Sequence, residues 1–174
     1  MSLDSTDDRS PIVTYRAELR EAFERLNRVW LEEHELLEPA DMEYLSDPEG
    51  LILATGGQVF FAVDGEHVIG TCAAIRVSDS TFELAKLAVD PAAQGRGLGR
   101  RLCHIVMRFA RDAGAVTMFL TSHEALTQAI HLYESLGFRH EPIPADVRYV
   151  TANVYMTLSL ADAQLPVVDA APTR

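Results

Sequence analysis

The order of hydrophobic and polar residues predicts ten secondary-structure elements along the chain. Short apolar runs or alternating patterns, typical of strands, occur at residues 12–15, 58–63, 67–77, 81–89, 116–121 and 153–160. Apolar residues at helical spacing occur at 19–30, 98–113 and 126–136. Pro39 is expected to open a shorter helix between the first of these and the strand at 58–63. This order predicts an α/β (α+β) fold, in which helices cover the faces of a mixed sheet.

The pattern stops at both ends of the chain. Residues 1–10 are polar and acidic, and residues 161–174 are rich in Ala, Asp and Pro without an apolar period, so we expect two flexible tails. Residues 11–160 are expected to form one domain. A chain of 174 residues, 48% of them hydrophobic, can bury a sizeable core.

Composition narrows the classes of partner. Fifteen Lys and Arg against 26 Asp and Glu give a net charge of −11, which argues against binding to the phosphate backbone of nucleic acids. Cys72 and Cys103 have neither metal-ligand spacing nor the density of a disulfide scaffold. No apolar stretch reaches the roughly 18 residues of a membrane span, and the first residues lack the apolar core of a signal peptide. We therefore expect a cytoplasmic protein without metal, membrane or nucleic-acid binding.

A glycine-rich turn is the most informative segment. Gly95, Gly97 and Gly99 alternate where a predicted strand gives way to a helix, and three arginines fall within residues 96–101. Glycine permits positive φ and close backbone approach, while a helix start offers free N–H groups and positive charge. The turn could hold a phosphate group, or it could be a tight structural turn.

Two common phosphate-binding motifs do not fit this turn. Counting from Gly95, the dinucleotide fingerprint requires a sixth-position glycine where the chain has Arg100. The loop of nucleoside triphosphatases requires Gly-Lys followed by Ser or Thr, which is absent from the turn.

The segment Gln94-Gly-Arg-Gly-Leu-Gly99, after a strand ending in Leu-Ala-Val-Asp-Pro, resembles the acyl-CoA pyrophosphate signature of the GNAT N-acetyltransferases. Leu132-Tyr-Glu-Ser-Leu-Gly-Phe138 resembles a second motif of that family. The resemblance covers about residues 11–160 and implies the GNAT fold, with six to seven mostly antiparallel strands and about four helices. More finely, Phe82–Val89 resembles the acetyltransferase half of bacterial fusions with a MarR-type regulator.

The resemblance implies that acetyl-CoA is the cofactor and that an amine attacks its thioester directly in a ternary complex. It places the cofactor against the end of the predicted strand at residues 81–89 and against the glycine turn. The implied cofactor-binding residues are Leu87, Ala88, Val89, Gln94, Gly95, Arg96, Gly97, Leu98, Gly99 and Arg100.

The same resemblance suggests two catalytic residues. Tyr133 lies where the family usually has a general acid, although its apolar helix face also fits a core aromatic. Glu83 is a candidate general base, or else a solvated or structurally paired carboxylate. Simple alternation puts Glu83 on one face with Leu87 and Val89, unless a bulge breaks the pattern. Lys86 is expected to be a surface or sheet-edge charge.

One position departs from the family pattern. Many relatives carry Asn where this chain has Leu126, which removes an expected contact to the pantetheine arm. Thr121, Ser122 or His123, at the end of the preceding strand, could supply the contact instead, and His123 could equally be an ordinary loop histidine.

The acceptor is suggested by an acidic block. Residues 32–49 hold eight Asp or Glu and no Lys or Arg, in the region that borders the acceptor in the family. This block could attract a cationic amine or simply be a solvated helix face. Trp30, His34 and Glu35 are the candidate substrate-binding residues.

The sequence thus favours an acetyl-CoA-dependent N-acetyltransferase acting on a primary amine of a small molecule or peptide. A non-catalytic acyl-CoA sensor or interaction module is the alternative, and an enzyme for longer acyl groups is a third reading. The last strand could also exchange between the subunits of a homodimer.

Overall fold

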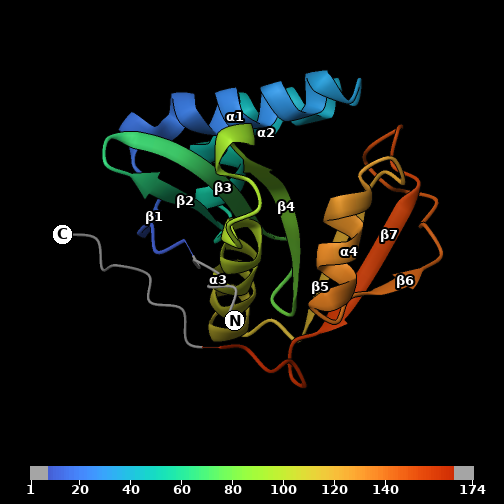
Figure 1. Cartoon of the computed structure of the whole chain (residues 1–174). Coiled ribbons are helices and arrows are strands. Elements are labelled where there is room, and N and C mark those ends of the chain that lie inside the picture. The colour runs from blue at the N-terminus through green and yellow to red at the C-terminus, as the bar shows by residue number, and fades with distance from the viewer. Residues whose placement is uncertain (1–7, 167–174) are drawn as a thin grey trace, which may run out of the picture.

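Seven strands form one mixed sheet in the order β1-β2-β3-β4-β5-β7-β6 in the computed structural model, which describes residues 8–166 (Figure 1). Only β4 and β5 run parallel; the other neighbours are antiparallel. The strands are β1 (Ile12–Thr14), β2 (Gln58–Asp64), β3 (His67–Arg76), β4 (Thr81–Val89), β5 (Thr117–Ser122), β6 (Arg139–Glu141) and β7 (Val154–Ser159).

Four α-helices cover the two faces of the sheet (Figure 1). They are α1 (Arg20–Glu33), α2 (Pro39–Ser46), α3 (Leu98–Asp112) and α4 (Thr127–Ser135). Short helical turns, η1 (Ala17–Leu19), η2 (Glu49–Leu53) and η3 (Pro91–Ala93), join some of the elements. The buried residues of α3 and Tyr133 of α4 belong to one hydrophobic cluster, whereas Phe23 of α1 and Leu45 of α2 belong to the other.

Successive residues of the central strands belong alternately to the two hydrophobic clusters. In β3, Cys72 and Ala74 belong to the α3 side, whereas Ala73 and Ile75 belong to the α1 side. On that second side the rings of Phe23 and Phe61 pack edge to face, with centroids 6.4 Å apart. Both faces of the central sheet are therefore buried under helices, which explains why the sequences of these strands are nearly continuous apolar runs.

A β-bulge interrupts β4 at Lys86. Thr71 pairs with Ala88 while Ala73 pairs with Ala85, so Lys86 and Leu87 both lie opposite Cys72. Lys86 has a φ of 56°, a left-handed conformation that is uncommon for a residue other than glycine. The bulge breaks the simple alternation that would keep Glu83 on one face with Leu87 and Val89.

The two halves of the sheet separate soon after β4 and β5 meet. These strands pair only over Thr81–Glu83 and Thr117–Phe119. Beyond Glu83, no strand of residues 8–166 pairs with this edge of β4, and β5 continues its pairing with β7 on its other side. The separation leaves a gap in the sheet, bordered by the unpaired part of β4 and the end of β5.

The predicted fold class is confirmed, and each of the ten predicted elements is present. The structure adds β6, which the sequence pattern missed because Arg139, His140 and Glu141 are all exposed and show no apolar alternation. The expected six to seven strands and four helices agree with the observed seven and four.

The described ends of the chain contact α3. Arg101 donates hydrogen bonds to the carbonyl oxygens of Asp8, at 2.6 Å, and Ser10, at 2.9 Å. Arg108 donates to the carbonyl oxygens of Leu165 and Pro166. The remainder of the two expected tails, residues 1–7 and 167–174, lies outside the described residues.

Candidate functional site

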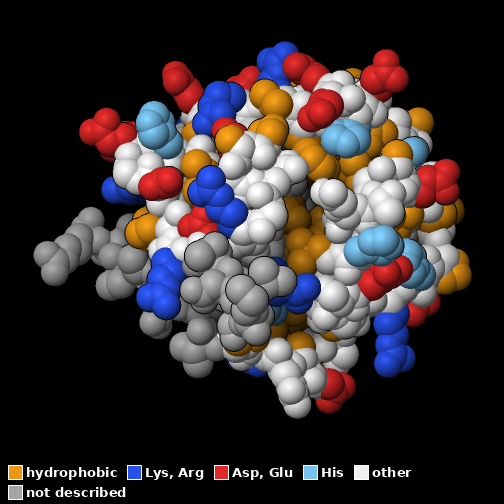
Figure 2. Space-filling view, in the orientation of Figure 1, with side chains coloured by type: hydrophobic (Ala, Val, Ile, Leu, Met, Phe, Trp, Pro, Cys, Tyr) orange, Lys and Arg blue, Asp and Glu red, His pale blue; other side chains and the backbone are white. Residues whose placement is uncertain are grey.

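A cleft of about 370 Å³ lies where β4 and β5 separate. Figure 2 shows this face hollowed into a groove with a hydrophobic floor. One wall comes from β4 and the start of α3, and the other from the end of β5 and α4. Residues of α1, α2 and the loop between β6 and β7 also line the cleft. The gap in the sheet thus brings together segments that lie far apart in the sequence.

The glycine turn presents the start of α3 to this cleft. Gly95 and Gly97 have φ values of 79° and 77°, and Gly97 is the N-cap of α3. Both angles lie in the left-handed region, which glycine adopts without the steric cost of a Cβ. The first N–H groups of a helix have no partner within it, and together they carry partial positive charge. The turn therefore offers an anion site at the cleft wall.

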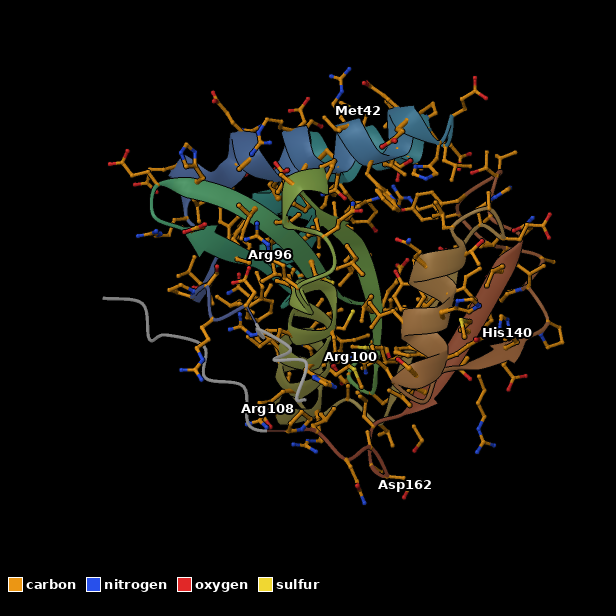
Figure 3. All side chains as sticks on the ribbon, in the orientation of Figure 1. Met42, Arg96, Arg100, Arg108, His140 and Asp162 are labelled. Atoms are coloured by element: carbon orange, nitrogen blue, oxygen red, sulfur yellow. The ribbon has the colours of Figure 1, made fainter. Side chains whose placement is uncertain are left out.

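Nine of the ten predicted cofactor-binding residues line the cleft. They are Leu87, Ala88, Val89, Gln94, Gly95, Gly97, Leu98, Gly99 and Arg100. Arg100 reaches from α3 to α4, where its guanidinium donates a 2.7 Å hydrogen bond to the Ser135 hydroxyl (Figure 3). It places a permanent positive charge beside the helix start.

The tenth residue, Arg96, is not brought into the cleft lining. Its side chain faces the N-terminal segment, with Nη1 3.5 Å from the Asp8 carboxylate and Nη2 3.1 Å from the Ala92 carbonyl oxygen. Figure 3 shows Arg96 and Arg100 on different sides of the turn. The sequence could not separate these two arginines, because the direction of each side chain depends on how the turn leads into α3.

Tyr133 lines the cleft from α4. Its ring is 8% exposed and lies against Phe138, with centroids 6.1 Å apart. Burial raises the pKa of the Tyr133 hydroxyl well above its usual value, and the nearby Cys103 and Cys72 thiols act in the same direction. The hydroxyl therefore keeps its proton at neutral pH and can donate it to a group in the cleft.

Glu83 lines the cleft at the point where β4 and β5 part. Its carboxylate has no hydrogen-bond partner within residues 8–166. Burial raises the pKa of Glu83 to about 7, although the positive charges of Lys86 and Arg148 oppose the shift. A carboxyl group with this pKa can both accept and release a proton near neutral pH.

Lys86 was expected to be a sheet-edge or a surface charge; it lies on the unpaired part of the β4 edge, but it is not a surface charge. Its side chain is 6% exposed and forms an ion pair with Asp41 of α2, whose side chain is 5% exposed. The Lys86 ammonium also donates a 3.1 Å hydrogen bond to the Tyr149 hydroxyl. The β4 bulge and the short distance to α2 bring this lysine inside, where the partner carboxylate compensates the loss of hydration.

The loop between β6 and β7 is fastened to α2 at the same end of the cleft. Both Glu38 carboxylate oxygens accept hydrogen bonds from this loop: from the Val150 N–H at 2.9 Å, the Thr151 N–H at 3.3 Å and the Thr151 hydroxyl at 2.8 Å. Arg148 pairs with Glu43 nearby. Sequence reasoning missed the lining residues Tyr149 and Thr151, because this irregular segment has no period and no recognisable motif.

Of the three predicted acceptor residues, Trp30 lines the cleft. His34 stacks on Trp30 with ring centroids 4.4 Å apart, and its Nδ1 lies 2.8 Å from the Trp30 carbonyl oxygen. Glu35 occupies the turn after α1 with a φ of 54°. Neither His34 nor Glu35 is among the residues that line the cleft.

The end of β5 also contributes to the cleft. Thr121, Ser122 and His123 all line it, as does Leu126. The Nδ1 atom of His123 accepts a 3.1 Å hydrogen bond from the Ala125 N–H, which fixes the ring within its own loop.

No group of three or more His, Cys, Asp or Glu side chains in residues 8–166 could hold a metal ion. Across the same range, no helix is long and apolar enough to cross a membrane.

Comparisons with known proteins agree with this geometry. A family model described as the acetyltransferase (GNAT) family matches residues 17–138. Mycothiol acetyltransferase of Rhodococcus erythropolis is 36% identical over 106 residues, which are 61% of this chain and 35% of that protein. The chain spans less than half the length of the curated relatives that match it first.

Solved structures share the fold. An acetyltransferase from Streptococcus agalactiae has a TM-score of 0.74 at 25% identity, covering 85% of this chain and 96% of that one. A GNAT family acetyltransferase from Elizabethkingia anophelis, solved with acetyl-CoA bound, has a TM-score of 0.58 at 20% identity, covering 87% and 99%.

Proposed function

The chain belongs to the acetyltransferase (GNAT) family, and we propose that it transfers the acetyl group of acetyl-CoA to a primary amine by direct attack in a ternary complex. The observation that carries this proposal is the cleft between β4 and β5. It combines an anion-binding helix start, a carboxyl group with a raised pKa and a buried phenol.

The residues of the cleft fit the chemical groups of acetyl-CoA. The N–H groups at the start of α3 and the Arg100 guanidinium suit the pyrophosphate. A Cβ at Gly95 would meet nothing within 4 Å, which leaves room for a ligand beside the turn. The unpaired edge of β4 from Leu87 to Val89 offers backbone groups to the amide-containing pantetheine arm.

Glu83 and Tyr133 supply the two proton transfers. The ammonium of the acceptor loses a proton to the Glu83 carboxylate, directly or through water, and becomes a nucleophile. Its nitrogen forms a bond to the acetyl carbonyl carbon, the C–S bond breaks, and the Tyr133 hydroxyl gives its proton to the departing sulfur. The nitrogen loses its second proton as the amide forms, and this proton restores the Tyr133 hydroxyl. The Leu87 N–H, which the bulge removes from the strand register, polarises the carbonyl oxygen.

The acceptor is a small molecule or peptide that carries the amine. The family membership leaves its identity open, since the relatives include proteins named for different products, such as mycothiol acetyltransferase and N-acetylaspartate synthetase. The finer resemblance to fusions with a MarR-type regulator has no support among these matches. The cytoplasmic location and the homodimer stay predictions.

A thiol-release assay tests the proposal. The protein is mixed with acetyl-CoA and a panel of primary amines, and free CoA and acetylated amine are measured together. Amine-dependent release of CoA with an equal amount of acetylated product is the expected result. Tight binding of CoA with no turnover on any amine would overturn the proposal in favour of a non-catalytic acyl-CoA sensor.

A further inference from the structure

We call the end of the cleft that is lined by α1, α2 and the loop between β6 and β7 the acceptor end. Most of its charged side chains are already paired within the protein. Four charged side chains line this end: Glu38, Asp41, Glu83 and Lys86. Arg100, the other lining residue with a fixed charge, stands beside the start of α3, where the pyrophosphate is proposed to bind. The charge that an acceptor meets therefore depends on which of the four already have partners.

Three of the four already have partners within the described structure. Glu38 accepts three hydrogen bonds from Val150 and Thr151. Asp41 and Lys86 form a closed ion pair, in which Asp41 also accepts a 2.9 Å hydrogen bond from the Glu38 N–H. Because this pair is buried and its polar atoms are engaged, separating the two charges is strongly unfavourable.

Glu83 is the one charged side chain of these four without a partner within residues 8–166. No hydrogen bond to its carboxylate is formed within residues 8–166, and the nearest cations, Lys86 and Arg148, are bound to Asp41 and Glu43. Most other side chains at this end are apolar or aromatic: Trp30, Leu31, Leu36 and the ring of Tyr149. The two polar ones, Asn27 and Thr151, donate hydrogen bonds within the protein, to the Phe23 carbonyl oxygen and to the Glu38 carboxylate. The site thus presents one unpaired anion within a mainly apolar wall.

From this arrangement we infer that the acceptor is a primary amine with a single positive charge on an apolar alkyl or aryl body, without a carboxylate. The inference rests on the proposed function and specifies its substrate class. An ammonium group would pair with Glu83 while its body lies against Trp30. A carboxylate beside the amine would be desolvated near Glu83, where the cations within residues 8–166 are already paired with Asp41 and Glu43.

The Asp41–Lys86 pair is then a specificity-determining element. While Asp41 holds the Lys86 ammonium, the described residues that line the acceptor end offer no unpaired cation to an acidic substrate. Replacing Asp41 by Asn would remove the negative partner and leave a positive charge facing the same cleft. The variant should therefore gain affinity for amines that carry a carboxylate.

The decisive comparison uses two amines that differ by one carboxylate. Phenethylamine and L-phenylalanine have the same aryl body, and each is titrated calorimetrically into the protein saturated with CoA. The dissociation constant should be at least about tenfold lower for phenethylamine. Equal binding, or tighter binding of L-phenylalanine or L-aspartate, would overturn the inferred substrate class.

Initial rates with acetyl-CoA separate this inference from the proposed function. Faster acetylation of an amino acid than of phenethylamine would overturn the substrate class and leave the acetyltransferase activity in place. Binding of phenethylamine without acetylation of any amine would overturn the activity and leave the selectivity of the site in place.

The variant experiment uses Asp41→Asn with Glu24→Gln as the matched control. Glu24 is an exposed residue of α1 that pairs with Arg28 outside the cleft. The preference is the dissociation constant of L-phenylalanine divided by that of phenethylamine. This ratio should be at least about fivefold smaller in Asp41→Asn than in wild type, and Glu24→Gln should leave it unchanged. An unchanged preference in a folded Asp41→Asn protein would remove the pair from this role; if that variant does not fold, the wild-type titration decides.

Discussion

The ammonium of Lys86, on the bulge of β4, forms a buried ion pair with the carboxylate of Asp41 on α2. The two residues are 45 positions apart in the sequence, and their contact fixes α2 to the central sheet beside the cleft. The same ammonium donates to Tyr149, so one side chain connects the sheet, α2 and the loop before β7.

Replacing Lys86 by Met should destabilise the protein by about 3–5 kcal/mol, because the Asp41 carboxylate would stay buried without its counter-charge. Urea unfolding at neutral pH measures the change. Arg28→Met, which removes the ion pairs with Glu24 and Glu32 on the helix surface, is the control and should change the stability far less. Similar losses for both variants would show that burial does not set the value of the Lys86 pair.

Glu83→Gln should remove a titration from the activity profile. With a pKa of about 7, Glu83 is protonated and inactive as a base at low pH, so kcat/KM should rise as pH increases through that value. The glutamine variant should lose the inflection near pH 7 and most of the rate. A steady-state pH profile shows this directly, and an inflection retained in the variant would assign the base to another group.

The same substitution should change stability in a pH-dependent way. The pKa of Glu83 is raised above its ordinary value of 4.5, so the folded protein holds the proton more tightly than the unfolded chain. Protonation of Glu83 therefore contributes to the stability of the folded wild type, and this contribution is lost as pH rises through about 7. Glu83→Gln has no such proton to lose. We expect the variant to exceed wild type in Tm by a few degrees at pH 8 but not at pH 4. An equal difference at both values would contradict the linkage.

Tyr133→Phe should lower kcat by about 100-fold while leaving the dissociation constant of acetyl-CoA nearly unchanged. The ring and its packing against Phe138 are preserved, and only the proton donor is lost. Chemistry must limit the rate for this comparison, which a pre-steady-state burst experiment establishes. Unchanged kcat under that condition would leave Tyr133 as a core aromatic.

Arg100→Ala and Arg96→Ala should differ in their effect on acetyl-CoA. Arg100 lines the cleft beside the start of α3, whereas Arg96 pairs with Asp8 outside it. Loss of a charged hydrogen bond to phosphate should raise the dissociation constant about tenfold for Arg100→Ala. The change for Arg96→Ala should be less than about threefold. Equal effects in calorimetry would place both arginines on the cofactor.

The sequence predicted the parts of the fold and site that depend on local chemistry. Gly95 and Gly97 could be recognised because a strand-to-helix turn with positive φ requires glycine, whatever surrounds it. The apolar periods located the long strands and helices in the same way. The glycine turn and the helix that carries Tyr133 were therefore found before any contact was known.

The remaining features depend on contacts between distant segments. Lys86 was misplaced because neither the bulge nor the Asp41 partner can be read from alternation along β4. Tyr149 and Thr151 lie in a segment without periodicity, and only its hydrogen bonds to Glu38 bring it to the cleft. The choice between Arg96 and Arg100 likewise needed the three-dimensional path of the turn.

The short pairing of β4 with β5 has a consequence for the dynamics of the sheet. Strands β5, β7 and β6 join the rest of the sheet through only three residue pairs, from Thr81 with Thr117 to Glu83 with Phe119. Such a narrow junction should let the two sub-sheets open as separate cooperative units, which amide hydrogen exchange would detect. A ligand that bridges both edges would couple them, so acetyl-CoA should slow exchange in β5 and β7 as well as in β4.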